Sequence, residues 1–377
     1  MSISIISTSA GNGHNVVMNT LKEGFKHKGY DVKGYPTFYE DLMPSNRVLH
    51  DFYNSLLETS FPLAIKYNEL SVLQGERWQN ELYRHSYNAI DQFIQKDKHM
   101  AIISTTPLLN KLILLYFKDN KLIGKIPFYI VVTDPYDPIY PGFEVKGANG
   151  YFCPNDTVGS ILLNAGVEAD KIKVFGYPVS CKFCCIPSDD EEVKIYNKYG
   201  LDPTKPVLLI NSSTHGSLHY FNILKSILSQ HICDMQIVMV CGKNRSLYNA
   251  AKFCYPKDRN KDIVILPYVN NIEELLYIAD ACLTKAGANT VYECLFTCTP
   301  LMIDAINGLL YQEKGIVKFL EQNKVGYVCK DDQDICQALD IMYNTSWKSD
   351  VKARISAMNI VNGTERIVAN ILNDIGL

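Results

Sequence analysis

The sequence predicts an α/β protein of two doubly wound, parallel-sheet domains that face each other across a cleft. Short apolar runs without polar alternation recur along the whole chain, as is typical of strands buried on both faces of a parallel sheet. Amphipathic segments of helical length separate most of these runs. The length of 377 residues favours two cores of about 150–200 residues each.

The predicted strands divide into two sets around a turn-rich joint. The apolar runs lie at 3–6, 101–103, 128–132, 207–210, 237–240, 263–266 and 301–303, and helical segments include 159–165 and 272–279. The joint reads GYPVSCKFCCIPSDDEE, with two prolines and an acidic run, and DPTKPVLLINSS then opens a fresh strand. We therefore expect the first domain to end near residue 184 and the second to begin near residue 190.

Composition narrows the class of protein. The net charge of −3 gives no basic surface of the kind that nucleic-acid binding needs. The chain contains no apolar run of about 18 residues and no secretion signal at its start, so we expect a cytoplasmic protein with reduced cysteines. Cys181 and Cys184 form a CxxC element, but no second ligand pair follows, so we expect no metal site.

Ligands of open α/β sheets bind beyond the carboxyl ends of the strands, so each loop after a strand is a candidate site. The first such loop, STSAGNGH, ends at Gly13 and His14. Its glycines let the backbone approach a ligand closely, and a histidine exchanges protons near neutral pH. His14 is thus a candidate for activating or positioning a substrate; a core or capping role is the alternative.

The segment LTKAGANTVYECL, residues 283–295, places small polar residues before a helix. Exposed N–H groups and the helix dipole favour an anion at such a terminus, and Asn289 and Thr290 add side-chain donors. Glu293, one turn later, is suited to bind the two hydroxyls of a ribose. The alternative is an ordinary helix start with an acidic first turn.

Four further loops carry polar groups after strands. Asp134 follows the strand 128–132 and fits either a general base or a turn acid. Gln312 and Glu313 suit sugar hydroxyls or an exposed helix start. Serines in NSSTHGS and the CGKN segment suit a pyrophosphate or helix caps, with candidates Ser212, Ser213, Gly242 and Asn244. We expect His215 to be a surface-loop histidine. Nucleoside-triphosphate and classical dinucleotide motifs are absent.

Together these segments resemble the glycosyltransferase family that contains monogalactosyldiacylglycerol synthases and bacterial processive diacylglycerol glucosyltransferases. The peptidoglycan N-acetylglucosaminyltransferase of lipid II synthesis is a more distant member. SAGNGH is similar to the family's Gly-rich turn ending in His, and PTFYEDLMPSNRVLHDFYNSL to its acceptor-domain segment. VVTDP and GYPVSCKF resemble two further signatures. The most specific similarity lies in CGKN, PYVNNIEELLYIADACLTKAGANTVYE and YQEKG, which resemble the donor-domain core.

The resemblance implies a GT-B fold of two Rossmann-like domains. Residues 1–184 would bind the acceptor, residues 190–354 the UDP-sugar, and a C-terminal helix at about 355–377 would pack back on the first domain. It implies an inverting transfer of a hexose to diacylglycerol or a related lipid, with no cofactor and no catalytic metal. The enzyme would work in the cytoplasm, at the inner face of the cell membrane.

The resemblance also implies roles for individual residues. Either His14 or Asp134 would be the base on the acceptor side. Glu293 would bind the ribose, and Gln312 and Glu313 the donor sugar. The pyrophosphate and the uracil would lie against the remaining candidates Ala288, Asn289, Thr290, Tyr268 and Val269.

Some positions depart from the family pattern. Ile139 and Tyr140 stand where a histidine is common, Tyr311 replaces a glycine, Ile316 an asparagine, and Asn12 the third glycine of the turn. Two alternatives therefore stay open: a glycosyltransferase of a soluble natural product, and a UDP-sugar-binding protein or hydrolase without transferase activity. The stretch 47–78 mixes apolar and basic residues, which fits an interfacial helix or ordinary core packing.

Overall fold

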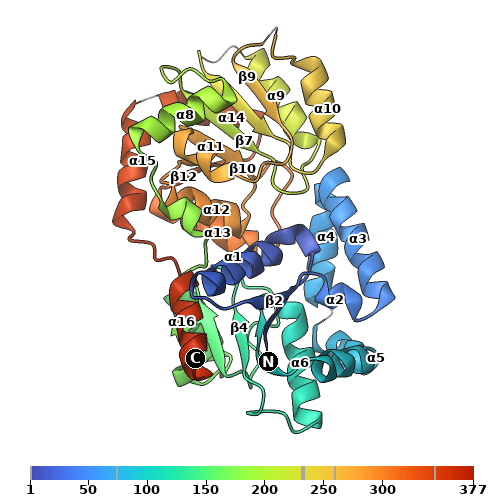
Figure 1. The fold of residues 1–377 in the computed structure, drawn as a ribbon. Coiled ribbons are helices and arrows are strands. Elements are labelled where there is room, and N and C mark those ends of the chain that lie inside the picture. Colours follow the sequence, from blue (N-terminus) through green and yellow to red (C-terminus); the bar gives the residue numbers. More distant parts are fainter. Residues whose placement is uncertain (1, 74, 231–233, 259, 344) are drawn as a thin grey trace.

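The computed structural model describes residues 2–73, 75–230, 234–258, 260–343 and 345–377. It contains two six-stranded sheets, each with helices on its faces, stacked end to end (Figure 1). Every pair of neighbouring strands in both sheets is parallel. The predicted two-domain α/β fold is therefore confirmed.

The first sheet has the strand order β2-β1-β3-β4-β5-β6. Its strands are β1 Ser2–Ile6, β2 Val32–Tyr35, β3 His99–Ser104, β4 Phe128–Val131, β5 Gly150–Cys153 and β6 Ile172–Val174. The helices of this half are α1 Gly13–His27, α2 Phe38–Asp41, α3 Pro44–Thr59, α4 Phe61–Leu73, α5 Gly75–Lys96, α6 Pro107–Asp119 and α7 Asp156–Asn164. The side chains of β4 and β5 are all buried, as expected for strands covered on both faces.

The second sheet has the order β12-β11-β10-β7-β8-β9. Its strands are β7 Val207–Asn211, β8 Gln236–Val240, β9 Ile263–Leu266, β10 Ala281–Thr284, β11 Leu301–Asp304 and β12 Gly326–Cys329. The helices are α8 Asp189–Tyr199, α9 His219–Ser229, α10 Arg245–Cys254, α11 Ile272–Ile278, α12 Ala288–Phe296, α13 Glu313–Asn323, α14 Asp332–Tyr343 and α15 Thr345–Ala357. All seven apolar runs that the sequence marked as strands lie in strands of the two sheets, apart from the last residue of 128–132.

The chain crosses between the two halves twice, and the crossings lie side by side. Tyr177 forms a parallel bridge with Asn362, whose side chain bonds both the N–H and the carbonyl of Val179. After the second crossing, α16 (Thr364–Asp374) packs against α1 in the first half (Figure 1). The sequence placed the start of this helix near residue 355, whereas α15 ends at Ala357 and α16 begins only after Gly363.

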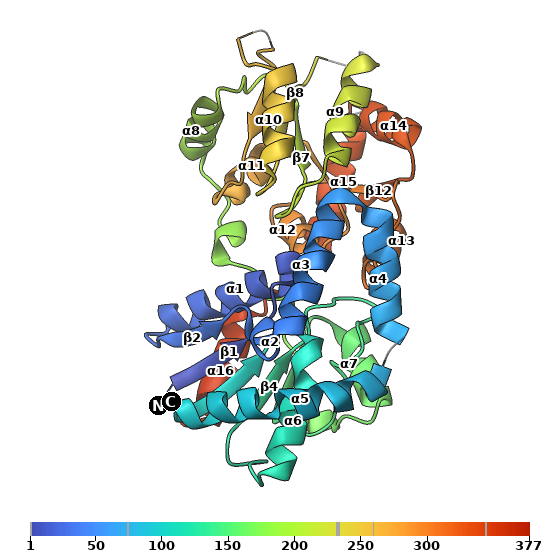
Figure 2. The same cartoon turned by 90° about the vertical axis from the view of Figure 1, so that its right-hand side faces the viewer.

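Helices α3 and α4 extend from the first half toward the second and stand beside the opening between them (Figure 2). They meet at Ser60, and Leu57 and Ala64 form a small apolar cluster with Leu310 of the second half. These helices thus place first-half side chains close to the loops that follow β7 and β11.

Candidate active site

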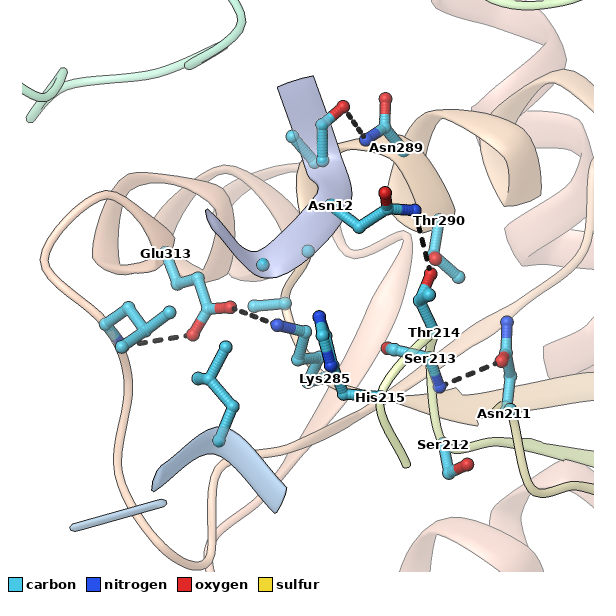
Figure 3. A pocket seen from close by; sticks show the side chains of 18 of the residues that line it. Asn12, Asn211, Ser212, Ser213, Thr214, His215, Lys285, Asn289, Thr290 and Glu313 are labelled. Atoms are coloured by element: carbon cyan, nitrogen blue, oxygen red, sulfur yellow. Dashed lines mark hydrogen bonds and ion pairs between the residues drawn. The ribbon is translucent and has the colours of Figure 1, made fainter. Parts of the chain in front are cut away.

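A cavity of about 290 Å³ lies between the two halves of the protein. It is bounded by loops at the carboxyl ends of strands from both sheets, as the sequence analysis expected of this fold. The candidate residues that line it are Gly13, His14, Asp134, Ser212, Ser213, Gly242, Tyr268, Val269, Ala288, Asn289, Thr290, Glu293, Gln312 and Glu313. Figure 3 shows Ser212 and Ser213 from the loop after β7, Asn289 and Thr290 from α12, and Glu313 from α13.

Asn244 is the candidate that does not line this cavity. Its Oδ1 accepts a hydrogen bond from the N–H of Leu247 at 2.9 Å, and its Nδ2 donates to the carbonyl of Gly216. The side chain therefore caps α10, which is the helix-cap alternative considered for this loop.

A second cavity, of about 190 Å³, lies within the first half among α3, α4 and the start of α6. Its lining combines apolar groups such as Leu82 and Leu108 with the polar groups of Asn68 and Ser71. The two cavities share the lining residues Ala10, His14, Tyr53, Asp134 and Gln312. The predicted base candidates thus lie where the two cavities meet.

His14 begins the first turn of α1, and its ring is held in one orientation. Nδ1 lies 2.8 Å from the carbonyl oxygen of Thr105 and 3.0 Å from Oγ1 of Thr133. Because a carbonyl only accepts, Nδ1 carries the proton, and the lone pair of Nε2 stays available. Burial lowers the pKa of His14 to about 4, so the imidazole is neutral near pH 7.

The turn before His14 is fixed by buried side chains of α2 and α3 that the sequence analysis did not single out. Oε1 of Glu40 accepts hydrogen bonds from the backbone N–H and hydroxyl of Ser9, from Thr8 Oγ1 and from His50 Nδ1. Burial opposes the ionisation of Glu40, but the bonds from His50 and Ser9 outweigh it and lower the pKa to about 2. Asn54 adds a bond to the N–H of Gly11. The spacing of these residues carries no local signal, because they meet only in the fold.

Asp134 follows β4 and is buried at the junction of the two cavities. Its Oδ2 accepts a hydrogen bond from the N–H of Tyr140 at 2.7 Å. Burial raises the pKa of Asp134 to about 6, more than the bond from Tyr140 lowers it. Near neutral pH this side chain is therefore a carboxylate of unusual basicity.

The N-terminus of α12 faces the larger cavity with Ala288, Thr290 and Glu293. Within the described part of the chain, no hydrogen bond or ion pair engages the Glu293 carboxylate. Burial raises its pKa to about 7. The half-exposed Tyr268 lines the same cavity, and the Lys243 ammonium lies 5.6 Å from the centroid of its ring. A carboxylate without a partner beside an open helix end can receive hydroxyl donors from a ligand.

Gln312 is the N-cap of α13 and Glu313 its first residue, and both line this cavity; Figure 3 shows Glu313 beside Lys285. Glu313 is 3% exposed, accepts a bond from the N–H of Leu310 and lies 3.7 Å from the Lys285 ammonium. Oε1 of Gln312 is buried and has no hydrogen-bond partner among the described residues. An unsatisfied buried acceptor at this place fits a hydroxyl group of a ligand.

Asn289 and His215 differ from what the sequence suggested. Both groups of the Asn289 amide are already bonded to protein: Nδ2 donates to the carbonyl of Gly13, and Oδ1 accepts from the Tyr177 hydroxyl. His215 is no surface-loop histidine, because it lines the cavity and its Nδ1 lies 3.2 Å from Glu58 of α3. Burial lowers the pKa of His215.

Among the described residues, no group of three or more His, Cys, Asp or Glu side chains is arranged to hold a metal ion. None of the helices, as far as they are described, combines the length and apolar character needed to cross a bilayer.

Each half of the chain matches a known protein family. The family described as monogalactosyldiacylglycerol (MGDG) synthase matches residues 14–179. The family described as glycosyltransferase family 28 C-terminal domain matches residues 214–303. The two matches fall on the two halves of the fold.

Relatives match along nearly the whole chain. The processive diacylglycerol β-glucosyltransferase of Bacillus licheniformis is 26% identical over 379 residues, covering 98% of this chain and 94% of the relative. The probable monogalactosyldiacylglycerol synthase 2 of Oryza sativa subsp. indica is 24% identical, covering 98% of this chain and 79% of the relative.

Solved structures share the fold. The MnaA–UDP co-structure from S. aureus superposes with a TM-score of 0.62 at 14% identity, covering 100% of this chain and 98% of that chain. MurG of Acinetobacter baumannii gives a TM-score of 0.60 at 13% identity, covering 99% and 100%. The chain therefore carries a monogalactosyldiacylglycerol synthase domain at 14–179 and a glycosyltransferase family 28 C-terminal domain at 214–303, and it is similar along 98% of its length to processive diacylglycerol glucosyltransferases and monogalactosyldiacylglycerol synthases.

Proposed function

We propose that this protein transfers a hexose from a UDP-sugar to a hydroxyl of diacylglycerol or a related lipid, by one inverting displacement without a catalytic metal. One observation carries the proposal: two cavities, one beside the open end of α12 and one within the first half, share His14, Asp134 and Gln312. A donor in one cavity and an acceptor in the other would meet at two groups able to take a proton. The names of the relatives supply the substrate classes.

The donor occupies the cavity of about 290 Å³. Its pyrophosphate lies at the N-terminus of α12, where the helix dipole and the Thr290 hydroxyl stabilise the charge that grows as UDP leaves. The ribose hydroxyls donate to Glu293. The transferred sugar lies against Gln312 and Glu313, next to the acceptor cavity.

The reaction forms one bond and breaks one bond. The acceptor oxygen attacks the anomeric carbon from the face opposite the pyrophosphate, the bond from that carbon to the phosphate oxygen breaks, and UDP leaves with the electron pair. The proton of the acceptor hydroxyl passes to Nε2 of His14 or to the carboxylate of Asp134. Near pH 7 Nε2 of His14 and the Asp134 carboxylate are both free to accept a proton, given pKa values of about 4 and about 6.

The lipid would reach the acceptor cavity from the surface formed by α3 and α4. Within the described residues, this surface exposes the large apolar side chains of Val48, Leu49, Phe52, Leu63, Leu70 and Leu73. Leu49 also lines the acceptor cavity, so the apolar surface continues into it. The stretch 47–78, for which the sequence left an interfacial helix or ordinary core packing open, spans most of these helices; residue 74 and the side chains of 75–78 lie outside the described part. We propose that this surface rests on the bilayer.

The proposal predicts lipid-dependent release of UDP. Wild-type protein incubated with UDP-glucose or UDP-galactose should release UDP only when diacylglycerol vesicles are added, and should yield a glycosylated lipid. UDP release that ignores the vesicles would contradict the lipid acceptor and indicate hydrolysis or a soluble acceptor. Binding of UDP without release from any donor would contradict transferase activity itself.

Substitution of each base candidate in turn tests which of them takes the proton. His14→Gln and Asp134→Asn remove one base each, and loss of the true base should lower kcat by about 10²–10⁴. At saturating donor, which removes the effect of Glu293 on binding, kcat of the wild type should fall with acidity as the base becomes protonated, near pH 6 for Asp134 or near pH 4 for His14. If neither variant lowers kcat tenfold or more, the junction of the cavities is not the reaction site.

The raised pKa of the Glu293 carboxyl leads us to expect that UDP binding depends on pH. The pKa of about 7 belongs to the unliganded protein, and two ribose hydroxyls donating to the carboxylate would lower it in the complex. The affinity for UDP should therefore be highest above pH 7 and should fall as the pH drops below 7. Calorimetric titrations between pH 5.5 and 8.5 should show this slope in wild type and lose it in Glu293→Gln. A pH-independent affinity in wild type would contradict the ribose assignment.

A charge on the apolar surface of α3 and α4 should weaken membrane binding and leave UDP binding unchanged. Phe52→Asp places a charge on the exposed apolar face of α3 and should reduce flotation with diacylglycerol-containing vesicles, while UDP binding stays unchanged. Phe253→Asp, on an exposed residue of α10 in the other half, is the matched control and should float like wild type. Equal flotation of the two variants would remove α3 from the proposed contact.

A further inference from the structure

The side chain of Asn289 joins the second half, where we place the donor, to the turn between β1 and α1 that leads to His14. Asn289 is the second residue of α12, and its Nδ2 donates to the carbonyl oxygen of Gly13 at 3.0 Å (Figure 3). Its Oδ1 accepts from the Tyr177 hydroxyl at 2.9 Å, at the first crossing between the halves. The amide thus makes strong bonds through both of its groups to parts of the protein outside α12.

These bonds leave the Asn289 side chain poorly placed to serve the pyrophosphate. One N–H of Nδ2 donates to Gly13 and Oδ1 accepts from Tyr177, so only the second N–H of Nδ2 remains for a ligand phosphate. Gly13 is the residue directly before His14, and a Cβ at Gly13 would lie 3.4 Å from Nδ2 of Asn289. The hydrogen bond from Nδ2 to the Gly13 carbonyl therefore links α12 to the residue before His14.

α12 also contacts the loop that carries the other base candidate. The Tyr292 ring stacks on the Tyr177 ring at 4.3 Å, and its hydroxyl lies 3.3 Å from the hydroxyl of Tyr136. Tyr136 comes two residues after Asp134, and its ring also stacks on Phe319 of α13 at 4.2 Å. The helix that faces the donor pyrophosphate is thus packed against both loops at the junction of the cavities.

We propose that Asn289 is a positioning residue: through its bond to Gly13 it aligns His14 with the acceptor when the donor occupies the N-terminus of α12. This inference rests on the proposed function, because it takes that helix end as the donor site. It replaces the direct pyrophosphate contact that the family resemblance implied for the Asn289 side chain.

Asn289→Ala removes both bonds, and Tyr177→Phe removes only the donor to Oδ1 while keeping the aromatic stack. We expect Asn289→Ala to lower kcat by about 10- to 100-fold, the scale of a misplacement of about 1 Å, with the Kd for UDP within about twofold of wild type. Tyr177→Phe should change kcat in the same direction by less. Asn249→Ala, an exposed asparagine of α10, is the matched control and should behave as wild type.

Two kinetic results would overturn the proposal. A tenfold weaker Kd for UDP in Asn289→Ala with kcat retained would show that the side chain binds the pyrophosphate. Unchanged kcat and Kd would show that the bond to Gly13 has no role in the reaction.

A second measurement does not depend on transferase activity. In protein labelled at its histidines, the His14 ring signal is assigned by its loss in His14→Gln and followed as UDP is added. UDP should shift this signal in wild type and much less in Asn289→Ala. If wild type shows the shift but no donor gives UDP release, the proposed function fails and the coupling stands. An identical shift in wild type and variant, or no shift in wild type, overturns the coupling.

Discussion

The placement of the short turn between β1 and α1 is the constraint on which the rest of the site depends. On the side of the first half, Glu40 and Asn54 bond the turn at Ser9 and Gly11. On the side of the second half, Asn289 bonds Gly13, and Nδ2 of Asn12 lies 3.5 Å from Thr214 Oγ1. Asn12 itself has a φ of 63°, so the turn takes a left-handed residue immediately before the helix. The turn that leads to His14 is thereby held by hydrogen bonds from both halves.

The site consists of two cavities that meet at His14 and Asp134. The larger one belongs to the loops of the second sheet and the helix end of α12, and the smaller one to α3 and α4 of the first half. Burial where the cavities meet changes the pKa values of both base candidates. It keeps His14 neutral and makes Asp134 a stronger base than an exposed aspartate, because it disfavours the charged form of each group.

Local sequence patterns predicted most of the framework and the loops of the site, but few of the contacts between them. Runs such as 207–210 and 237–240 are apolar throughout and mark strands clearly, and the loops that follow them lie at the cleft because parallel strands end at one edge. The strands β2, β5, β6 and β12 were missed because glycine or lysine shortens or interrupts their apolar runs. The pairs Glu40–His50, Glu58–His215 and Asn289–Gly13 join residues that only the tertiary fold brings together, so no local pattern marks them.

The stereochemistry of the product tests the central claim most directly. If donor and acceptor occupy the two cavities on opposite faces of the junction, attack must come from the side away from the pyrophosphate. Incubation of an α-linked UDP-sugar with diacylglycerol vesicles, followed by NMR measurement of the anomeric proton coupling of the purified glycolipid, should then give only the β-linked product. An α-linked glycolipid would contradict the in-line displacement at this junction.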